Sequence, residues 1–93
     1  MDAYYQGIRR KIDTGKRLNQ RERVFYLLYT RYLGGFTTPL PLIMDLRIAQ
    51  HTARIHELRA LFPGRIKNRF VWVDGRKLSE YYISREVGQL SIL

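Results

Sequence analysis

The chain of 93 residues has the length of one small domain with a single modest core. Its hydrophobic fraction of 45% argues against disorder of the whole chain. It has no cysteine, which excludes disulfides and thiolate metal sites and is consistent with a reducing compartment. Seventeen Lys and Arg against eight Asp and Glu give a formal net charge of +9. This excess predicts either a polyanionic partner or only a basic, well-solvated surface.

The distribution of apolar residues predicts a cytoplasmic protein that does not bind a membrane. No apolar run reaches the length of a membrane span. The first residues include Asp2 and the basic run Arg9–Lys11, where a signal segment would be hydrophobic.

The N-terminal segment, residues 1–17, is basic and is expected to form a short amphipathic helix. Tyr5, Ile8 and Ile12 recur at helical spacing, and the run Arg9–Lys11 lies beside them. This basic run either faces phosphates or only makes an accessory helix soluble.

Residues 18–84 begin with the pattern of a strong helix. Asn19 and Glu22 match a capping box, in which each side chain satisfies a free amide of the other residue. The helix is expected to run to about Leu33 and to end at Gly34–Gly35. Its expected apolar stripe consists of Val24, Leu27 and Leu28, extended by Arg31 and Tyr32.

Two further helices form the predicted helix-turn-helix. Thr37 or Thr38 is expected to cap the second helix, with Pro39 in its first turn. A turn at residues 47–49 leads to a third helix over residues 50–61. The expected apolar side of the second helix is Leu40, Ile43, Met44 and Leu46, and that of the third is Thr52, Ile55, Leu58 and Phe62.

Residues 65–83 change to the period of β-strands and predict a hairpin. Asp74–Gly75 is a favoured pair for a two-residue turn, which fixes the register by pairing Val73 with Arg76. The same register pairs Arg69 with Glu80, whose opposite charges support it. The face expected to pack on the helices holds Ile66, Phe70, Trp72, Tyr81 and Ile83, and the opposite face holds Lys67, Arg69, Arg76 and Glu80.

This order of elements predicts an α+β fold, a winged helix-turn-helix over residues 18–84. It would have a three-helix core plus a β-hairpin wing, preceded by an extra short N-terminal helix and followed by a tail over residues 85–93.

The segments Thr37–Ile48 and Thr52–Arg59, followed by the Asp74–Gly75 turn and Tyr81–Ile83, resemble small helix-turn-helix proteins of bacteriophages and prophages. The resemblance spans about residues 18–83. It implies double-stranded DNA as the partner and a role as a regulator or replication accessory, in the cytoplasm of a bacterial host or an infected cell.

The third helix is the candidate recognition helix. If Ile55 and Leu58 face the core, Gln50 and Arg54 are the best candidates to read bases, because glutamine matches adenine and arginine matches guanine in bidentate fashion. Alternatively, Arg54 is solvated or pairs with Glu57 three positions later. Further expected DNA contacts are Thr37 or Thr38, Arg47, and the wing residues Arg76 and Lys77, which are otherwise only solvated. His51 is expected either to contact a phosphate or to cap its helix.

Catalysis and cofactor binding have no support in the sequence. His51 and His56 lie five positions apart on one helix, so they point to different faces and do not form a metal pair. The acidic residues are scattered, and neither a phosphate-binding loop nor a nucleophile motif is present. We expect a protein that is not an enzyme and needs no cofactor.

The last residues of the chain, Gln89–Leu93, resemble the bacterial sliding-clamp-binding peptide. In that family a glutamine, a leucine and a terminal hydrophobic pair anchor an extended peptide in a pocket of the clamp. Carried over to this sequence, the anchors are Gln89, Leu90, Ile92 and Leu93. The alternative is an apolar tail that packs on its own domain.

Other partners stay open at the level of the sequence. The main alternative to DNA binding is a protein-interaction module or inhibitor that binds a host replication or transcription protein, such as the sliding clamp. RNA binding through the same basic surface is a weaker alternative. A homodimer face is also conceivable from residues 40–44 or from the aromatic first helix, which equally suit the core.

Overall fold

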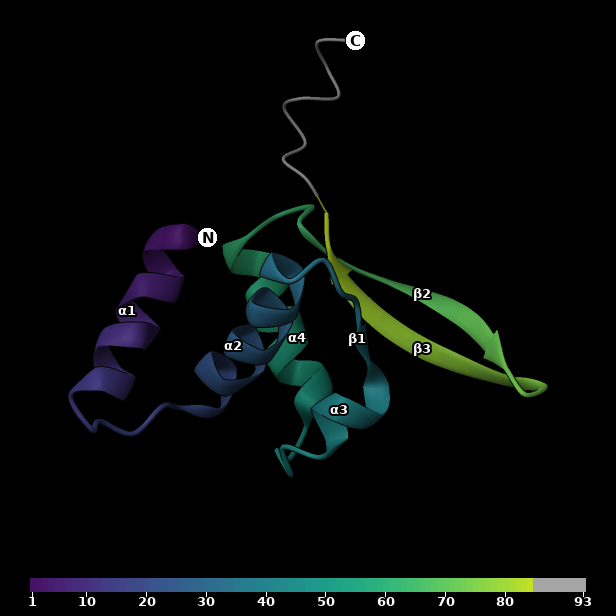
Figure 1. Ribbon diagram of the computed structural model, residues 1–93, viewed down its shortest axis with the longest axis horizontal. Coiled ribbons are helices and arrows are strands. Elements are labelled where there is room, and N and C mark those ends of the chain that lie inside the picture. The colour runs from purple at the N-terminus through teal and green to yellow at the C-terminus, as the bar shows by residue number, and fades with distance from the viewer. Residues whose placement is uncertain (85–93) are drawn as a thin grey trace, which may run out of the picture.

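The computed structural model describes residues 1–84, which form four helices and a three-stranded antiparallel sheet (Figure 1). The helices are α1 (Asp2–Asp13), α2 (Gln20–Leu33), α3 (Leu40–Met44) and α4 (His51–Leu61). The strands are β1 (Thr38–Pro39), β2 (Ile66–Val73) and β3 (Arg76–Ile83), in the order β1-β3-β2. The predicted α+β class is confirmed, and the arrangement is compatible with a winged helix. The predicted clamp-binding tail lies outside the described residues.

Helix α2 begins and ends as its sequence predicts. The Oδ1 of Asn19 accepts a hydrogen bond of 2.7 Å from the amide of Glu22, and the amide of Asn19 donates one of 2.9 Å to Oε1 of Glu22. This capping box satisfies two amides that have no partner within the helix. At the other end, Gly34 is still helical and Gly35 takes the left-handed φ of 82°. The second of the two glycines therefore allows the chain to leave the helix.

The buried face of α2 is shifted from the predicted stripe. Val24 and Leu28 are buried as expected, but Phe25 and Tyr29 are buried as well, and Leu27 is only half-buried. The physical reason is α1, which covers the aromatic side of α2 and which the stripe did not take into account. The core of residues 1–84 consists of Ile8, Val24, Phe25, Leu28, Tyr29, Ile43, Ile48, Ile55, Leu58, Ile66 and Ile83.

The predicted N-terminal helix is present as α1, which lies beside α2 on the side away from the hairpin (Figure 1). Ile8 is its buried anchor, and the ring of Tyr4 meets that of Phe25 edge-on with centroids 4.7 Å apart. The Nζ of Lys11 lies 2.7 Å from Oε2 of Glu22. Helix α1 is therefore packed on the domain rather than held only by its basic run.

The start of α3 differs from the prediction. Neither Thr37 nor Thr38 caps it: Pro39 is the N-cap, and no side chain accepts a hydrogen bond there. Thr38 is paired with Tyr81 in the sheet, and the Oγ1 of Thr37 donates to Oε2 of Glu80 over 3.0 Å. Because the backbone of Thr38 is paired in the sheet and the hydroxyl of Thr37 is bonded to Glu80, the helix begins only after Pro39, and neither threonine occupies its N-cap.

The hairpin has the predicted register throughout, from Val73 opposite Arg76 to Ile66 opposite Ile83. Its turn residues take positive φ angles of 49° at Asp74 and 75° at Gly75, as a type I′ turn requires.

The predicted packing of the hairpin is wrong for its outer half. Ile66 and Ile83 are buried against the helices, but 58% of Phe70 and 73% of Trp72 are exposed. The reason is visible in Figure 1, where β2 and β3 extend well beyond the helices, so no other element of residues 1–84 covers the outer part of the face.

Among residues 1–84, no helix has both the length and the apolar character needed to cross a membrane.

Candidate nucleic-acid interface

Helix α4 is fixed to the core by Ile55 and Leu58, which are 1% and 0% exposed. It begins at His51, one residue later than predicted, after Gln50 with a left-handed φ of 55°. Thr52 was expected to face inward but is exposed. At about 100° per residue, Thr52 lies about 60° beyond Ile55 and about 120° from Leu58, which places it outside the buried stripe.

The outward side of α4 presents small or polar side chains and carries little charge. Thr52 and His56 are exposed, and Ala60 is exposed one turn beyond His56. His51, at the start of the helix, is half-buried. A helix surface of small and polar side chains can approach another molecule closely. Thr52 and His56 were not predicted as contacts, although the spacing of Ile55 and Leu58 already places them off the core.

The predicted base reader Arg54 lies against α2 instead of on the outward side of α4. Its Nε is 2.9 Å from Oε1 of Glu57, and its Nη1 donates to Oε1 of Gln20 over 3.5 Å. The Nε is buried and has no partner in hydrogen-bond geometry, so its interaction with Glu57 is an ion pair without a well-aligned hydrogen bond. The alternative interpretation, pairing with Glu57, matches this placement.

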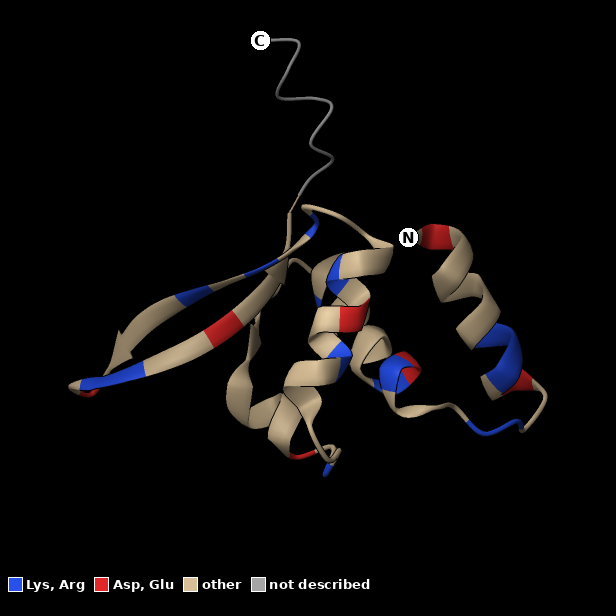
Figure 2. Ribbon diagram, turned by 180° about the vertical axis from the view of Figure 1, so that it is seen from behind, with Lys and Arg blue, Asp and Glu red and all other residues tan. Residues whose placement is uncertain are grey.

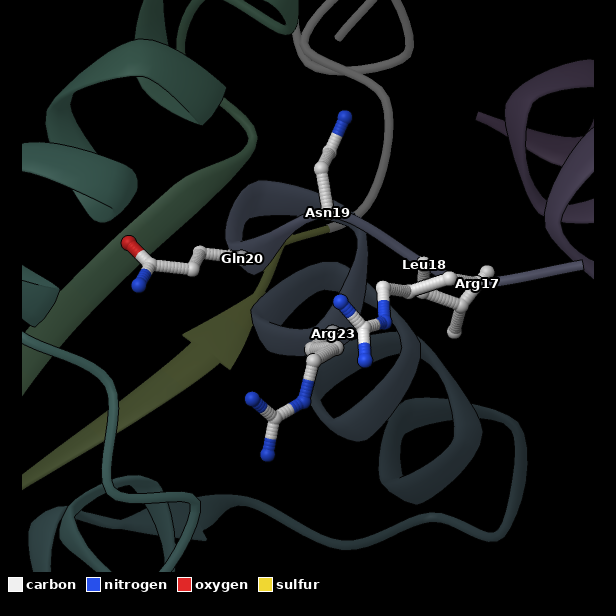
Figure 3. A pocket seen from close by; sticks show the side chains of 5 residues that line it. All are labelled: Arg17, Leu18, Asn19, Gln20 and Arg23. Atoms are coloured by element: carbon white, nitrogen blue, oxygen red, sulfur yellow. The ribbon is translucent and has the colours of Figure 1, made fainter.

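Basic side chains surround the start of α2 and line a shallow hollow there (Figure 3). Its exposed lining residues are Arg17, Asn19, Gln20 and Arg23, and Figure 3 shows both guanidinium groups beside the first turn of the helix. Gln20 also lines the neighbouring hollow that includes Arg54, so the two hollows adjoin. Sequence reasoning missed Arg17 and Arg23. The available signal was the placement of arginines at a helix start, where the helix dipole favours acidic residues.

The turn between α3 and α4 is held close to this basic surface. The Nη2 of Arg23 donates to the carbonyl oxygen of Leu46 over 2.8 Å. Ile48 is buried, while Arg47 and Gln50 on either side are exposed and have left-handed φ angles of 54° and 55°. Each such residue costs about 1–3 kcal/mol of strain, and Ile48 between them anchors the turn in the core. The predicted contacts Arg47 and Gln50 are therefore presented at the surface.

Arg59 links α4 to the hairpin and fixes their relative orientation. Its Nε donates to the carbonyl oxygen of Ile66 over 3.1 Å, and its Nη2 donates to Oδ1 of Asn68 over 2.9 Å. The guanidinium also lies 6.0 Å from the ring centroid of Tyr81. Because Arg54 contacts α2 and Arg59 contacts β2, the start of α2 and the hairpin lie on opposite sides of α4.

The end of the hairpin presents two cations. Arg76 and Lys77 are both exposed, as predicted, and the Nζ of Lys77 lies 4.2 Å from the ring centroid of Phe70. Further from the turn, Arg69 forms an ion pair with the buried carboxylate of Glu80. Hydrogen bonds from Arg69 and Thr37 lower the pKa of Glu80 below its ordinary value, although burial acts in the opposite direction.

Thr38 is removed from the predicted contacts. Thr38 is 1% exposed, because β1 pairs with β3 and holds this residue in the interior of the domain. A residue at this depth cannot reach a phosphate or a base without unfolding of the strand. Thr37, the other threonine considered, is half-buried and bonded to Glu80.

Most basic side chains of residues 1–84 are not neutralised by acids. The ion pairs within this range are Lys11–Glu22, Arg54–Glu57 and Arg69–Glu80. Other arginines, such as Arg23 and Arg59, donate to carbonyl oxygens, which leaves their charge uncompensated. Figure 2 shows basic segments on α1, at the start of α2, on α4 and along the hairpin. The surface therefore keeps the excess of positive charge that the composition indicates.

Residues 1–84 contain no group of three or more His, Cys, Asp or Glu side chains placed to hold a metal ion. Comparisons with known protein families, with curated proteins and with solved structures found no match for the chain.

Proposed function

We propose that this protein is a winged helix-turn-helix protein that binds duplex DNA, with α4 in the major groove and the β2–β3 hairpin as its wing. The order of the elements supports the proposal: α2, α3 and α4 form a three-helix core, and β1 joins the hairpin in one sheet. The observation that carries it is the presence of exposed cations on both sides of α4, at the start of α2 and at the end of the hairpin.

A duplex offers the complementary arrangement. Its major groove is about 12 Å wide and admits a helix, with a row of phosphates on either side. Thr52 and His56, with Gln50 at the N-cap, are the side chains that we propose read base edges. Arg54 is held by Glu57 and Gln20, so we assign it to the orientation of α4 against α2 rather than to base reading. The proposed phosphate contacts are Arg17, Arg23, Arg47, Arg76 and Lys77.

The finer roles expected from the sequence stay predictions. A regulator and a replication accessory both need a DNA-binding surface of this kind, which does not distinguish them. The clamp-binding peptide involves residues outside the described range, so no contact in the fold bears on it.

The experiment that tests DNA binding is a titration of a fluorescently labelled random-sequence duplex, followed by anisotropy over a series of salt concentrations. We expect the logarithm of the affinity to fall with the logarithm of the salt concentration by about 0.9 per phosphate contact, because each contact releases counterions. The double variant Arg76→Gln/Lys77→Gln should make this slope shallower by roughly 1 to 2 units and weaken all sequences alike.

The matched control is Arg10→Gln, which removes an exposed cation from α1, on the side of α2 away from the hairpin. It should leave the slope nearly unchanged. His56→Ala should instead reduce discrimination among sequences chosen from a random pool, with little effect on the salt slope. If no duplex binds at low salt, the proposed function is wrong. If Arg10→Gln makes the slope as shallow as the double variant does, the assigned face is wrong.

A further inference from the structure

The outer half of the hairpin carries two large aromatic side chains that nothing in residues 1–84 covers. Phe70 and Trp72 lie on the same face of β2 and are 58% and 73% exposed. Lys77, opposite Trp72 on β3, shares this face, and its ammonium group lies over the ring of Phe70. The ring of Trp72 is therefore the more open of the two.

We propose that this face of the wing, defined by Phe70, Trp72 and Lys77, binds unpaired nucleobases by stacking. The inference rests on the proposed function, because it makes the wing a second contact to the same nucleic acid. Exposed aromatic rings beside cations are the combination by which proteins bind single strands: the rings stack on bases and the cations meet the phosphates. On this surface Trp72 supplies the ring and Lys77 the nearby charge.

The charges of the hairpin favour a nucleic acid as the occupant. Beyond the Arg69–Glu80 pair, the outer half holds Arg76 and Lys77 against the single acid Asp74 at the turn. A second copy of the chain is the main competing occupant. A symmetric contact through this face would desolvate the Lys77 ammonium group of each copy, and the register of residues 66–83 places no acid on this face to pair with it, which is costly. A strand with phosphates instead neutralises them.

The inference predicts a preference for DNA with unpaired bases. Stacking of one base on an aromatic side chain contributes about 1–3 kcal/mol, so a duplex with a central bubble of unpaired thymines should bind at least about fivefold more tightly than the same duplex fully paired. The preference should be present at each salt concentration, because it comes from stacking and not from additional phosphates.

The protein provides its own reporter, since Trp72 is its only tryptophan. We would measure Trp72 fluorescence with the paired duplex, the bubble duplex and oligothymidine, and measure affinities by anisotropy of labelled DNA. Trp72 emission should be quenched by the bubble and by oligothymidine but only weakly by the paired duplex. Trp72→Ala should abolish the preference for the bubble while leaving affinity for the paired duplex nearly unchanged, and Trp72→Phe should retain most of the preference.

Phe36→Ala is the matched control, because Phe36 is an exposed aromatic, 64% accessible, outside the hairpin. It should leave the preference intact. Circular dichroism melts confirm that each variant is folded. Equal binding of both duplexes with no quenching would overturn the inference and leave the proposed function standing. Binding and quenching by oligothymidine without any binding of paired duplex would support the inference and overturn the proposed function.

Two other outcomes also decide the question. A blue shift of Trp72 emission that grows with protein concentration in the absence of DNA, together with a doubled mass in sedimentation, would show that a second copy covers this face and would overturn the inference. Absence of binding to all three DNAs would overturn both the inference and the proposed function.

Discussion

The two halves of the hairpin have the same alternation of side chains but opposite environments. In the half next to the helices, Ile66 and Ile83 are 3% and 6% exposed. In the outer half, Phe70 and Trp72 lie on the same face and are mostly exposed. The difference shows that the alternation determines which side chains share a face, while the extent of the helical layer determines how much of that face is buried.

The comparison also separates stability from function within one pair of strands. Burial of apolar area stabilises the fold, so the inner half contributes to the free energy of unfolding. An exposed aromatic contributes little to that free energy and is available to a partner. Substitutions in the two halves should therefore affect different measurements.

The largest effect is expected for Ile83→Ala, in the inner half. Ile83 is opposite Ile66 and belongs to the core, so its truncation loses buried apolar area and leaves a cavity. We expect a loss of about 2–5 kcal/mol in the free energy of unfolding, measured by urea denaturation. Ile83→Val is the control and should cost about 0.5–1.5 kcal/mol. An Ile83→Ala protein as stable as the parent would contradict the placement of this side chain in the core.

A smaller effect is expected at the boundary between the halves, where Glu80 joins Arg69 and Thr37. Glu80→Gln leaves the shape nearly unchanged but removes the charge and leaves one acceptor oxygen for the two donors Arg69 and Thr37. We therefore expect a loss of about 1–3 kcal/mol at neutral pH. The pKa of Glu80 is lowered from its ordinary value of 4.5 on folding. Its contribution is therefore complete above that value and is lost as the pH falls through the lower pKa of the folded state.

The measurement is a series of urea denaturations between pH 7 and pH 2 for the parent and Glu80→Gln. The difference between the two proteins should shrink on the acid side. Burial raises the pKa of Glu22, but hydrogen bonds from Lys11 and Asn19 outweigh it and the net shift is downward, so Glu80→Gln should still lose some stability in acid. A difference that stays constant over the whole pH range would show that the charge of Glu80 is not what the contacts stabilise.

The register of the hairpin could be predicted because its determinants are local. Asp74–Gly75 favours one turn type, and the strict period of two then places every other residue. The capping box of α2 is predictable for the same reason, since Asn19 and Glu22 are three residues apart. Burial of Phe70 and Trp72 was predicted wrongly because it depends on how far the helical layer extends under the hairpin, which no short pattern contains.

The site shows the same limit. Thr38 pairs with Tyr81, 43 residues later, so its burial follows from a sheet contact that local capping rules do not include. Arg54 contacts Gln20 from 34 residues earlier, and only its pairing with Glu57 was visible in the sequence. The sequence predicted the start of the candidate recognition helix to within one residue. It placed Arg54 on the outward side of that helix, whereas Arg54 lies on the side that faces α2.

The smallest effect on stability is expected for Trp72→Ala, in the outer half. Although tryptophan is the largest side chain in the protein, 73% of Trp72 is exposed, so truncation removes little buried area and leaves no cavity. We expect a change within about 0.5 kcal/mol in the free energy of unfolding. Because Trp72→Ala lacks the only tryptophan, the comparison uses circular dichroism for both proteins. A loss approaching that of Ile83→Ala would show that the outer half of the hairpin is also covered in solution, and the contrast between the two halves would then disappear.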